Sequence, residues 1–263
     1  MRLGLCTQLE ALDEAAEAGF DYAEMSASAL APGADEAAFA PIRRRMLAGR
    51  VRVEAFNGFL PADVRVTGPQ VDRVRLRAHM DRVLRRAGEV GAAVVVFGSG
   101  GARRLPEGFP AEEGWRQLAE AARLAADLAA DNGITIAMEP LFQRGCNFFN
   151  RVEQGSEFVD RIGRPALKLL ADLFHMAAEQ EPLEHVAAAG ARLAHIHVPA
   201  PSLPEMAEGP DYDFAAFFDA LRRAGYRGRV SLEDNGQGLA RCRAPRLDAC
   251  RAARHYLGTL ICG

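Results

Sequence analysis

Four apolar segments in the second half of the chain end in side chains that can bind a metal ion. In sequence order these side chains are Glu139 in ITIAMEP (134–140), Asp172 in LKLLADL (167–173), His195 and His197 in LAHIHV (193–198), and Glu233 and Asp234 in RVSLED (229–234). A carboxylate is costly to bury without a partner, and a cation is the strongest partner available to it. The four segments therefore predict a metal site if the fold brings their ends together.

Alternation along an extended strand indicates which of these side chains share a face. His195 and His197 lie on the same face, with His197 nearer the strand end, so we take His197 as the ligand and His195 as a residue one layer deeper. Glu233 and Asp234 face opposite ways, and the apolar Leu232 faces away from Glu233. This pattern predicts that Glu233 points inward.

The predicted ligand set, Glu139, Asp172, His197 and Glu233, contains three carboxylates and one imidazole. Such an oxygen-rich site suits Mn²⁺, Mg²⁺ or Co²⁺, and Zn²⁺ is an alternative. Three ionised carboxylates would repel one another, so without a cation at least one would take up a proton. Each residue alone also has a structural explanation, because a carboxylate at a strand end commonly caps a helix and a histidine on an apolar strand commonly belongs to the core. Four of them at consecutive strand ends favour the metal site.

The segments that carry these residues continue a pattern of alternating strands and helices. The four earlier predicted strands are RLGLC (2–6), YAEMSA (22–27), VRVEAF (51–56) and AAVVVFG (92–98). Helix-period segments lie between the strands, and several end in a helix-capping glycine: Gly19, Gly91, Gly133 and Gly225. Eight such units without a linker predict a single (β/α)8 TIM barrel, one domain over residues 1–263, whose active site gathers at the carboxyl ends of the strands. A doubly wound sheet competes, but no GxGxxG or GxxxxGKS/T motif follows the first strand.

Composition limits the classes of partner. The 263 residues are 49% hydrophobic and carry a formal net charge of −3, so no global positive field favours nucleic acid or an anionic membrane. Five scattered cysteines without a CxxC pair indicate reduced thiols. No signal-peptide pattern or long apolar run is present, and we therefore expect a cytoplasmic protein that acts on a small molecule.

Seven motifs along the chain carry a family resemblance. They are NGFLPADVRVTGP (57–69), VFGSGGARRLPEGFP (96–110), EPL (139–141), CNFFN (146–150), LLADLFHM (169–176), LAHIHV (193–198) and GRVSLE (228–233). In this order and spacing they resemble the sugar phosphate isomerase/epimerase superfamily, the xylose isomerase-like TIM barrels. The ketose 3-epimerases and hydroxypyruvate isomerases are the branches that they resemble most.

The resemblance implies one divalent ion, commonly Mn²⁺, held by Glu139, Asp172, His197 and Glu233. It also implies that Glu139 and Glu233 transfer protons on opposite faces of a bound ketose, while His175 reaches a substrate oxygen. Relatives often assemble, so a homodimer or homotetramer is implied as well.

The implied reaction is isomerisation or epimerisation of a small ketose, sugar phosphate or hydroxy-keto acid. A metal ion chelated by adjacent carbonyl and hydroxyl oxygens acidifies the intervening C–H and stabilises the metal-bound enediolate. One glutamate removes the proton, and the other returns it on the opposite face or at the neighbouring carbon. A lyase is the alternative, in which a dehydratase of an inosose or 3-dehydroshikimate type substrate would expel a β-hydroxyl at the same metal site.

Substrate contacts are less well determined. Gly145 and Leu203 stand where the ketose epimerases have a glutamate and an arginine that contact sugar hydroxyls. Arg144 lies beside this gap, and we predict that it contacts substrate, because arginine binds carboxylates and phosphates bidentately; a solvated loop arginine is the alternative. Asn57, at the end of the third strand, either hydrogen-bonds substrate or caps a turn.

Arg103 and Arg104, which follow GSGG (98–101), have the same two explanations as Arg144.

Two other function classes share this fold or could use it. A DNA repair endonuclease needs about three zinc ions and more histidines than this chain offers, since His79, His185 and His255 fall in predicted helices. A non-catalytic binding barrel would keep its ligand affinity and stability after metal removal.

Overall fold

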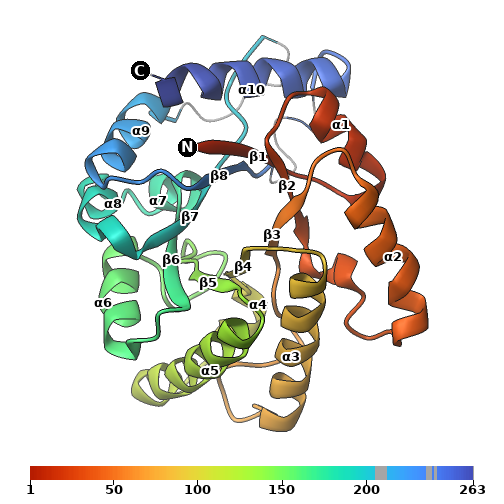
Figure 1. The fold of residues 1–263 in the computed structure, drawn as a ribbon. Helices are drawn as coiled ribbons and strands as arrows, with labels where there is room; N and C mark the ends of the chain where they lie inside the picture. Colours follow the sequence, from red (N-terminus) through yellow and green to blue (C-terminus); the bar gives the residue numbers. More distant parts are fainter. Residues whose placement is uncertain (205–211, 235–238, 240–241, 263) are drawn as a thin grey trace.

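The predicted barrel is present. A computed structural model describes residues 1–204, 212–234, 239 and 242–262, and its eight parallel strands close into one barrel in sequence order, as Figure 1 shows. The strands are β1 Arg2–Cys6, β2 Tyr22–Ser26, β3 Val53–Asn57, β4 Val94–Phe97, β5 Thr135–Met138, β6 Leu167–Asp172, β7 Leu193–Val198 and β8 Arg229–Leu232. The fold is a single TIM barrel.

Helices surround the barrel (Figure 1). The α-helices are α1 Leu12–Glu17, α2 Glu36–Ala48, α3 Arg73–Glu89, α4 Gly100–Arg103, α5 Ala111–Asp131, α6 Val152–Ile162, α7 Leu173–Ala178, α8 Glu184–Ala189, α9 Phe214–Arg223 and α10 Arg246–Cys262. The 3₁₀ turns among the described residues are η1 Leu9–Ala11, η2 Ala27–Leu30 and η3 Gly190–Arg192. Among the described helices, none combines the length and hydropathy that crossing a membrane requires.

The strand ends differ from the predicted ones by at most two residues, for local reasons. The strand predicted over 134–140 stops at Met138, because Pro140 two residues later has no N–H to continue the ladder. The one predicted over 167–173 stops at Asp172, whose side chain accepts a hydrogen bond from the Phe174 N–H and starts α7. The four predicted capping glycines all have positive φ: Gly19 (83°), Gly91 (82°), Gly133 (68°) and Gly225 (71°).

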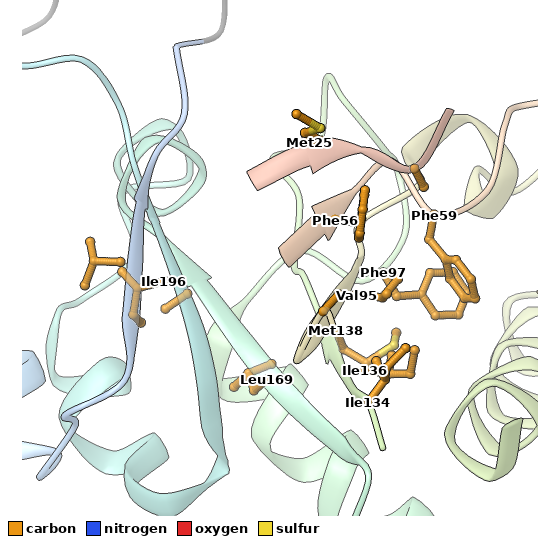
Figure 2. Packing of buried hydrophobic residues seen from close by; sticks show 14 of the residues in the cluster. Met25, Phe56, Phe59, Val95, Phe97, Ile134, Ile136, Met138, Leu169 and Ile196 are labelled. Carbon is orange, nitrogen blue, oxygen red and sulfur yellow. The ribbon is translucent and has the colours of Figure 1, made fainter. Parts of the chain in front are cut away.

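The buried side chains of the strands separate into two sets by alternation. One small cluster fills the barrel interior: Tyr22, Ala55, Val94, Val96, Ala137 and Leu170. The residues between them in sequence belong to the larger core outside the strands, which Figure 2 shows through Met25, Phe56, Val95, Met138, Leu169 and Ile196 among others. The predicted ligands are in register with the interior set, since Glu139 is two residues after Ala137 and Asp172 is two after Leu170. The same period of two that builds the core therefore aims these ligands into the barrel mouth.

Candidate metal centre and active site

The four predicted ligands converge. One ligand atom each from Glu139, Asp172, His197 and Glu233 can be chosen so that all four lie within 4.8 Å of one another. The Nδ1 atom of His197 is 3.2 Å from Glu139 Oε1 and 3.1 Å from Glu233 Oε2. Glu139, Asp172 and His197 are buried, whereas the Glu233 side chain is 21% exposed. The cluster thus has one open side.

Asp172 uses its two oxygens differently. Oδ1 accepts the hydrogen bond from the Phe174 N–H at 2.8 Å, so the helix-capping explanation is correct for this oxygen. Oδ2 is buried without a hydrogen-bond partner and faces His175 Nε2 at 3.5 Å. Burial, together with the charges of Glu233 and Glu139, raises the pKa of Asp172 to about 6, although His175 acts in the opposite direction. Oδ2 of Asp172 is therefore available to bind a cation, which would satisfy this buried oxygen.

The residues present fit a divalent cation. Burial opposes a charge on His197, but the surrounding carboxylates, Glu24 and Glu233 foremost, outweigh it and hold the pKa of the imidazole well above its ordinary value. The site therefore favours positive charge beside Nδ1, which a divalent ion supplies. With oxygen donors from Glu139 and Asp172 as well, the donor set matches a hard metal ion.

His175 lies at the edge of the cluster in a fixed orientation. Its ring stacks on Phe142, with centroids 5.3 Å apart and planes 18° apart, and Phe174 contacts it edge-on. The His175 side chain is 13% exposed. It is placed to meet a molecule that reaches Asp172, and its contact with substrate stays a prediction.

Asn57 also faces the cluster. Its Nδ2 donates to Glu233 Oε1 at 3.1 Å and lies 3.9 Å from Cys6 Sγ. Neither bond caps a turn. Asn57 therefore holds the partly exposed Glu233 in place, and a contact with substrate stays a prediction.

The three arginines occupy different positions. Arg144 is exposed, and its carbonyl accepts a hydrogen bond at 2.9 Å from Arg104, which is exposed as well. Arg103 has no exposed surface: Nη2 donates to the Glu139 carbonyl at 2.8 Å, and the guanidinium lies 5.2 Å from the Phe149 ring centroid. Both predicted explanations are wrong for Arg103, because this residue ends the short helix α4 and its side chain is buried against the end of β5. Substrate binding by Arg144 stays a prediction.

Sequence reasoning missed Glu24 of β2. Its side chain is fully buried and meets both histidines of β7, with Oε2 2.7 Å from His195 Nε2 and Oε1 3.0 Å from His197 Nε2. A signal was available, because Glu24 is the only acid in YAEMSA and lies two residues after the inward Tyr22. His195 lies one layer deeper than His197, as predicted. Its hydrogen-bond partner, Glu24, was not predicted.

A cavity of about 530 Å³ adjoins the cluster, and Glu24, Asn57 and Glu233 contribute to its wall. This size suits a small-molecule ligand. A Cβ at Gly145 would lie 2.7 Å from the Phe142 ring, so Phe142 fills the space that a side chain at position 145 would need. Gly145 therefore offers no side chain to a bound molecule.

Gly98, directly after β4, leaves the space that the Glu139 carboxylate occupies. A Cβ at residue 98 would overlap Glu139 Oε2, which cannot stay in place beside it. We expect Gly98→Ala to lower catalytic efficiency about 100-fold, because it displaces Glu139, the predicted proton-transfer residue, and a displacement of about 1 Å can cost this much. Steady-state kinetics and Mn²⁺ titration measure the effect. Gly33→Ala is the matched control, because a Cβ there meets nothing within 4 Å; equal activity of the two variants would contradict this role.

Comparison with known proteins identifies the family of this chain and the relatives of its fold. A family model described as the xylose isomerase-like TIM barrel matches residues 12–257. The chain is 31% identical over 233 residues to the L-ribulose 3-epimerase of Methylomonas sp. (strain DH-1), covering 85% of this chain and 77% of that protein. It is also 31% identical over 144 residues to a probable ketose 3-epimerase of Synechocystis sp., covering 51% of this chain and 50% of that protein. The fold resembles a crystal structure of D-psicose 3-epimerase in the presence of D-fructose, with a TM-score of 0.83 and 18% identity over 100% of both chains.

Proposed function

The chain belongs to the xylose isomerase-like TIM-barrel family, and we propose that it is a divalent-metal-dependent epimerase of a small ketose. Ketose 3-epimerases are its relatives, and it is an enzyme of the sugar isomerase and epimerase class. The observation that carries the proposal is the meeting of two glutamates, one aspartate and one histidine at the barrel mouth: Glu139, Asp172, His197 and Glu233. The lyase alternative is not supported by the relatives reported above, which are named ketose 3-epimerases.

The proposed metal ligands are these same four residues. A divalent ion bound there, Mn²⁺ by preference, supplies Lewis acidity that makes a C–H beside a carbonyl easier to ionise. Glu139 and Glu233 follow β5 and β8, which are separated in the barrel by β6 and β7. We assign proton removal to one of these carboxylates and proton return to the other.

The remaining residues position the substrate in this proposal. Asn57 fixes one oxygen of Glu233, so that the other is directed at the cluster. His175, held against Phe142, hydrogen-bonds a substrate oxygen next to Asp172. Arg144 contacts an exposed group of the substrate at the rim. A cytoplasmic location and a homodimer or homotetramer complete the proposal.

Solvent exchange tests the reaction. The Mn²⁺-loaded protein is incubated in D₂O with D-psicose, D-fructose, L-ribulose, sugar phosphates and hydroxypyruvate in separate reactions. We expect deuterium at C3 of at least one ketose together with its C3 epimer, detected by mass spectrometry and NMR. Absence of exchange on every compound, with Mn²⁺, Co²⁺ and Mg²⁺ each tried, would contradict the proposal.

Metal removal gives a second expected result. After dialysis against a chelator, activity falls below detection and returns when Mn²⁺ is added, because the carboxylate cluster alone cannot stabilise the charge that develops on substrate. Added Mn²⁺ also raises the melting temperature, since an ion that binds only the folded state stabilises it. Activity that survives complete metal removal, verified by elemental analysis, would rule out the metal-dependent mechanism.

A further inference from the structure

Glu24 occupies an unusual place for a carboxylate. It projects from β2 into the barrel and reaches two histidines of β7, although β1 and β8 separate these strands. Its side chain is fully buried, and among the described residues the ion pairs of Glu24 are with His195 and His197 and with no arginine or lysine. Packing alone does not explain a buried carboxylate at this position, because an apolar residue would fill the same space at a lower cost in desolvation free energy.

The contact with His197 determines which nitrogen of that ring carries a proton. Glu24 Oε1 lies 3.0 Å from His197 Nε2 and Oε2 lies 2.7 Å from His195 Nε2, so each oxygen of the carboxylate meets one ring nitrogen, and a carboxylate accepts hydrogen bonds. The Nε2 atom of His197 must then donate to Glu24. The Nδ1 atom, which faces Glu139 and Glu233, is left to offer its lone pair to a cation.

We propose that Glu24 is a positioning residue of the metal centre, which orients the His197 ring and fixes its tautomer so that Nδ1 binds the ion. This inference rests on the proposed function. A carboxylate on the outer nitrogen of a ligating histidine holds the ring direction and increases its basicity. Glu24 acts through His197 and does not itself contact substrate in this assignment.

The hydrogen bonds of His195 provide a control that distinguishes positioning of His197 from general structural support. His195 Nε2 lies 3.2 Å from Ser231 Oγ, which lies 2.9 Å from the Tyr22 hydroxyl. Ser231 is buried like Glu24 and is the neighbour of His197 across β7 and β8, but its hydroxyl bonds to His195 and Tyr22 and makes no described hydrogen bond to the His197 ring. Ser231→Ala is therefore a matched control that disturbs the buried network and leaves the orientation of His197 intact.

The test measures Mn²⁺ affinity together with the stability of the metal-free protein. Glu24→Gln keeps the shape, but its amide can accept from one histidine only and must donate to the other. Free Mn²⁺ is followed by its EPR signal during titration, and the melting temperature is measured in a chelator. We expect Glu24→Gln to weaken Mn²⁺ binding about 10- to 100-fold, while Ser231→Ala binds Mn²⁺ like the wild type even where its melting temperature falls.

Two further variants keep the result decisive. Glu24→Asp, which retains the charge but is too short to reach both histidines, replaces Glu24→Gln if that variant does not fold, and it is expected to weaken binding too. His197→Asn removes a proposed ligand. If the wild type binds Mn²⁺ no better than His197→Asn, the proposed function fails. If the wild type binds tightly but either folded Glu24 variant binds equally well, or Ser231→Ala weakens binding as much, only the assignment of Glu24 is overturned.

Discussion

Glu139→Gln and Glu233→Gln should each lower kcat for net epimerisation about 100- to 10,000-fold, yet each should retain exchange of one substrate proton with solvent. The reason is that the two carboxylates are assigned to opposite faces of the substrate, so one remains able to remove the proton on its own side. Glu139→Gln would then exchange deuterium into one C3 epimer, and Glu233→Gln into the other.

The measurement uses both C3 epimers as separate substrates in D₂O, with Mn²⁺ at saturation and the bound metal quantified. This control matters because both glutamates are also proposed ligands, and a glutamine binds a metal ion more weakly than a carboxylate. Glu112→Gln, an exposed position in the first turn of α5, is the matched control and should retain wild-type activity. If both site variants exchange the same epimer, the assignment to opposite faces is wrong.

Asp172→Asn should stabilise the metal-free protein at neutral pH while removing Mn²⁺ binding. The folded-state pKa of about 6 exceeds the ordinary value of 3.8, so ionisation of Asp172 opposes folding increasingly as the pH rises from 3.8 and does so fully above pH 6. A shift of this size corresponds to at most about 3 kcal/mol. Asparagine carries no charge, and its oxygen can still accept the hydrogen bond from Phe174 that begins α7.

The pH dependence has a definite sign. Well below pH 3.8 the carboxyl is protonated in both the folded and the unfolded chain, so its raised pKa costs no stability there. The advantage of the asparagine variant should therefore be largest above pH 6 and should become smaller as the pH falls from 6 toward 3.8. Urea unfolding in a chelator at pH 7.5 and 4.5 measures this change. With Mn²⁺ added at pH 7.5 the order should reverse, because only the wild type gains binding energy; a variant less stable than the wild type in chelator at pH 7.5 would contradict the prediction.

The sequence was sufficient for the barrel and for the direction of the ligands. Strand identity depends on short apolar runs, and the inward direction of Glu139, Asp172 and Glu233 follows from a period of two that each strand expresses locally. The ends of the strands were less exact for equally local reasons, such as the missing N–H of Pro140. The order of the strands then placed all these ends on one face.

Contacts between residues on different strands and loops were not predictable in the same way. Asn57 meets Glu233, Arg103 lies buried beneath Glu139, and Glu24 crosses the barrel to the histidines of β7. Such distances depend on the tilt and register of all eight strands and on how each loop folds back, and no single segment contains that information. The sequence by itself therefore determined which side chains point into the barrel, and only closure of the barrel decided which of them touch.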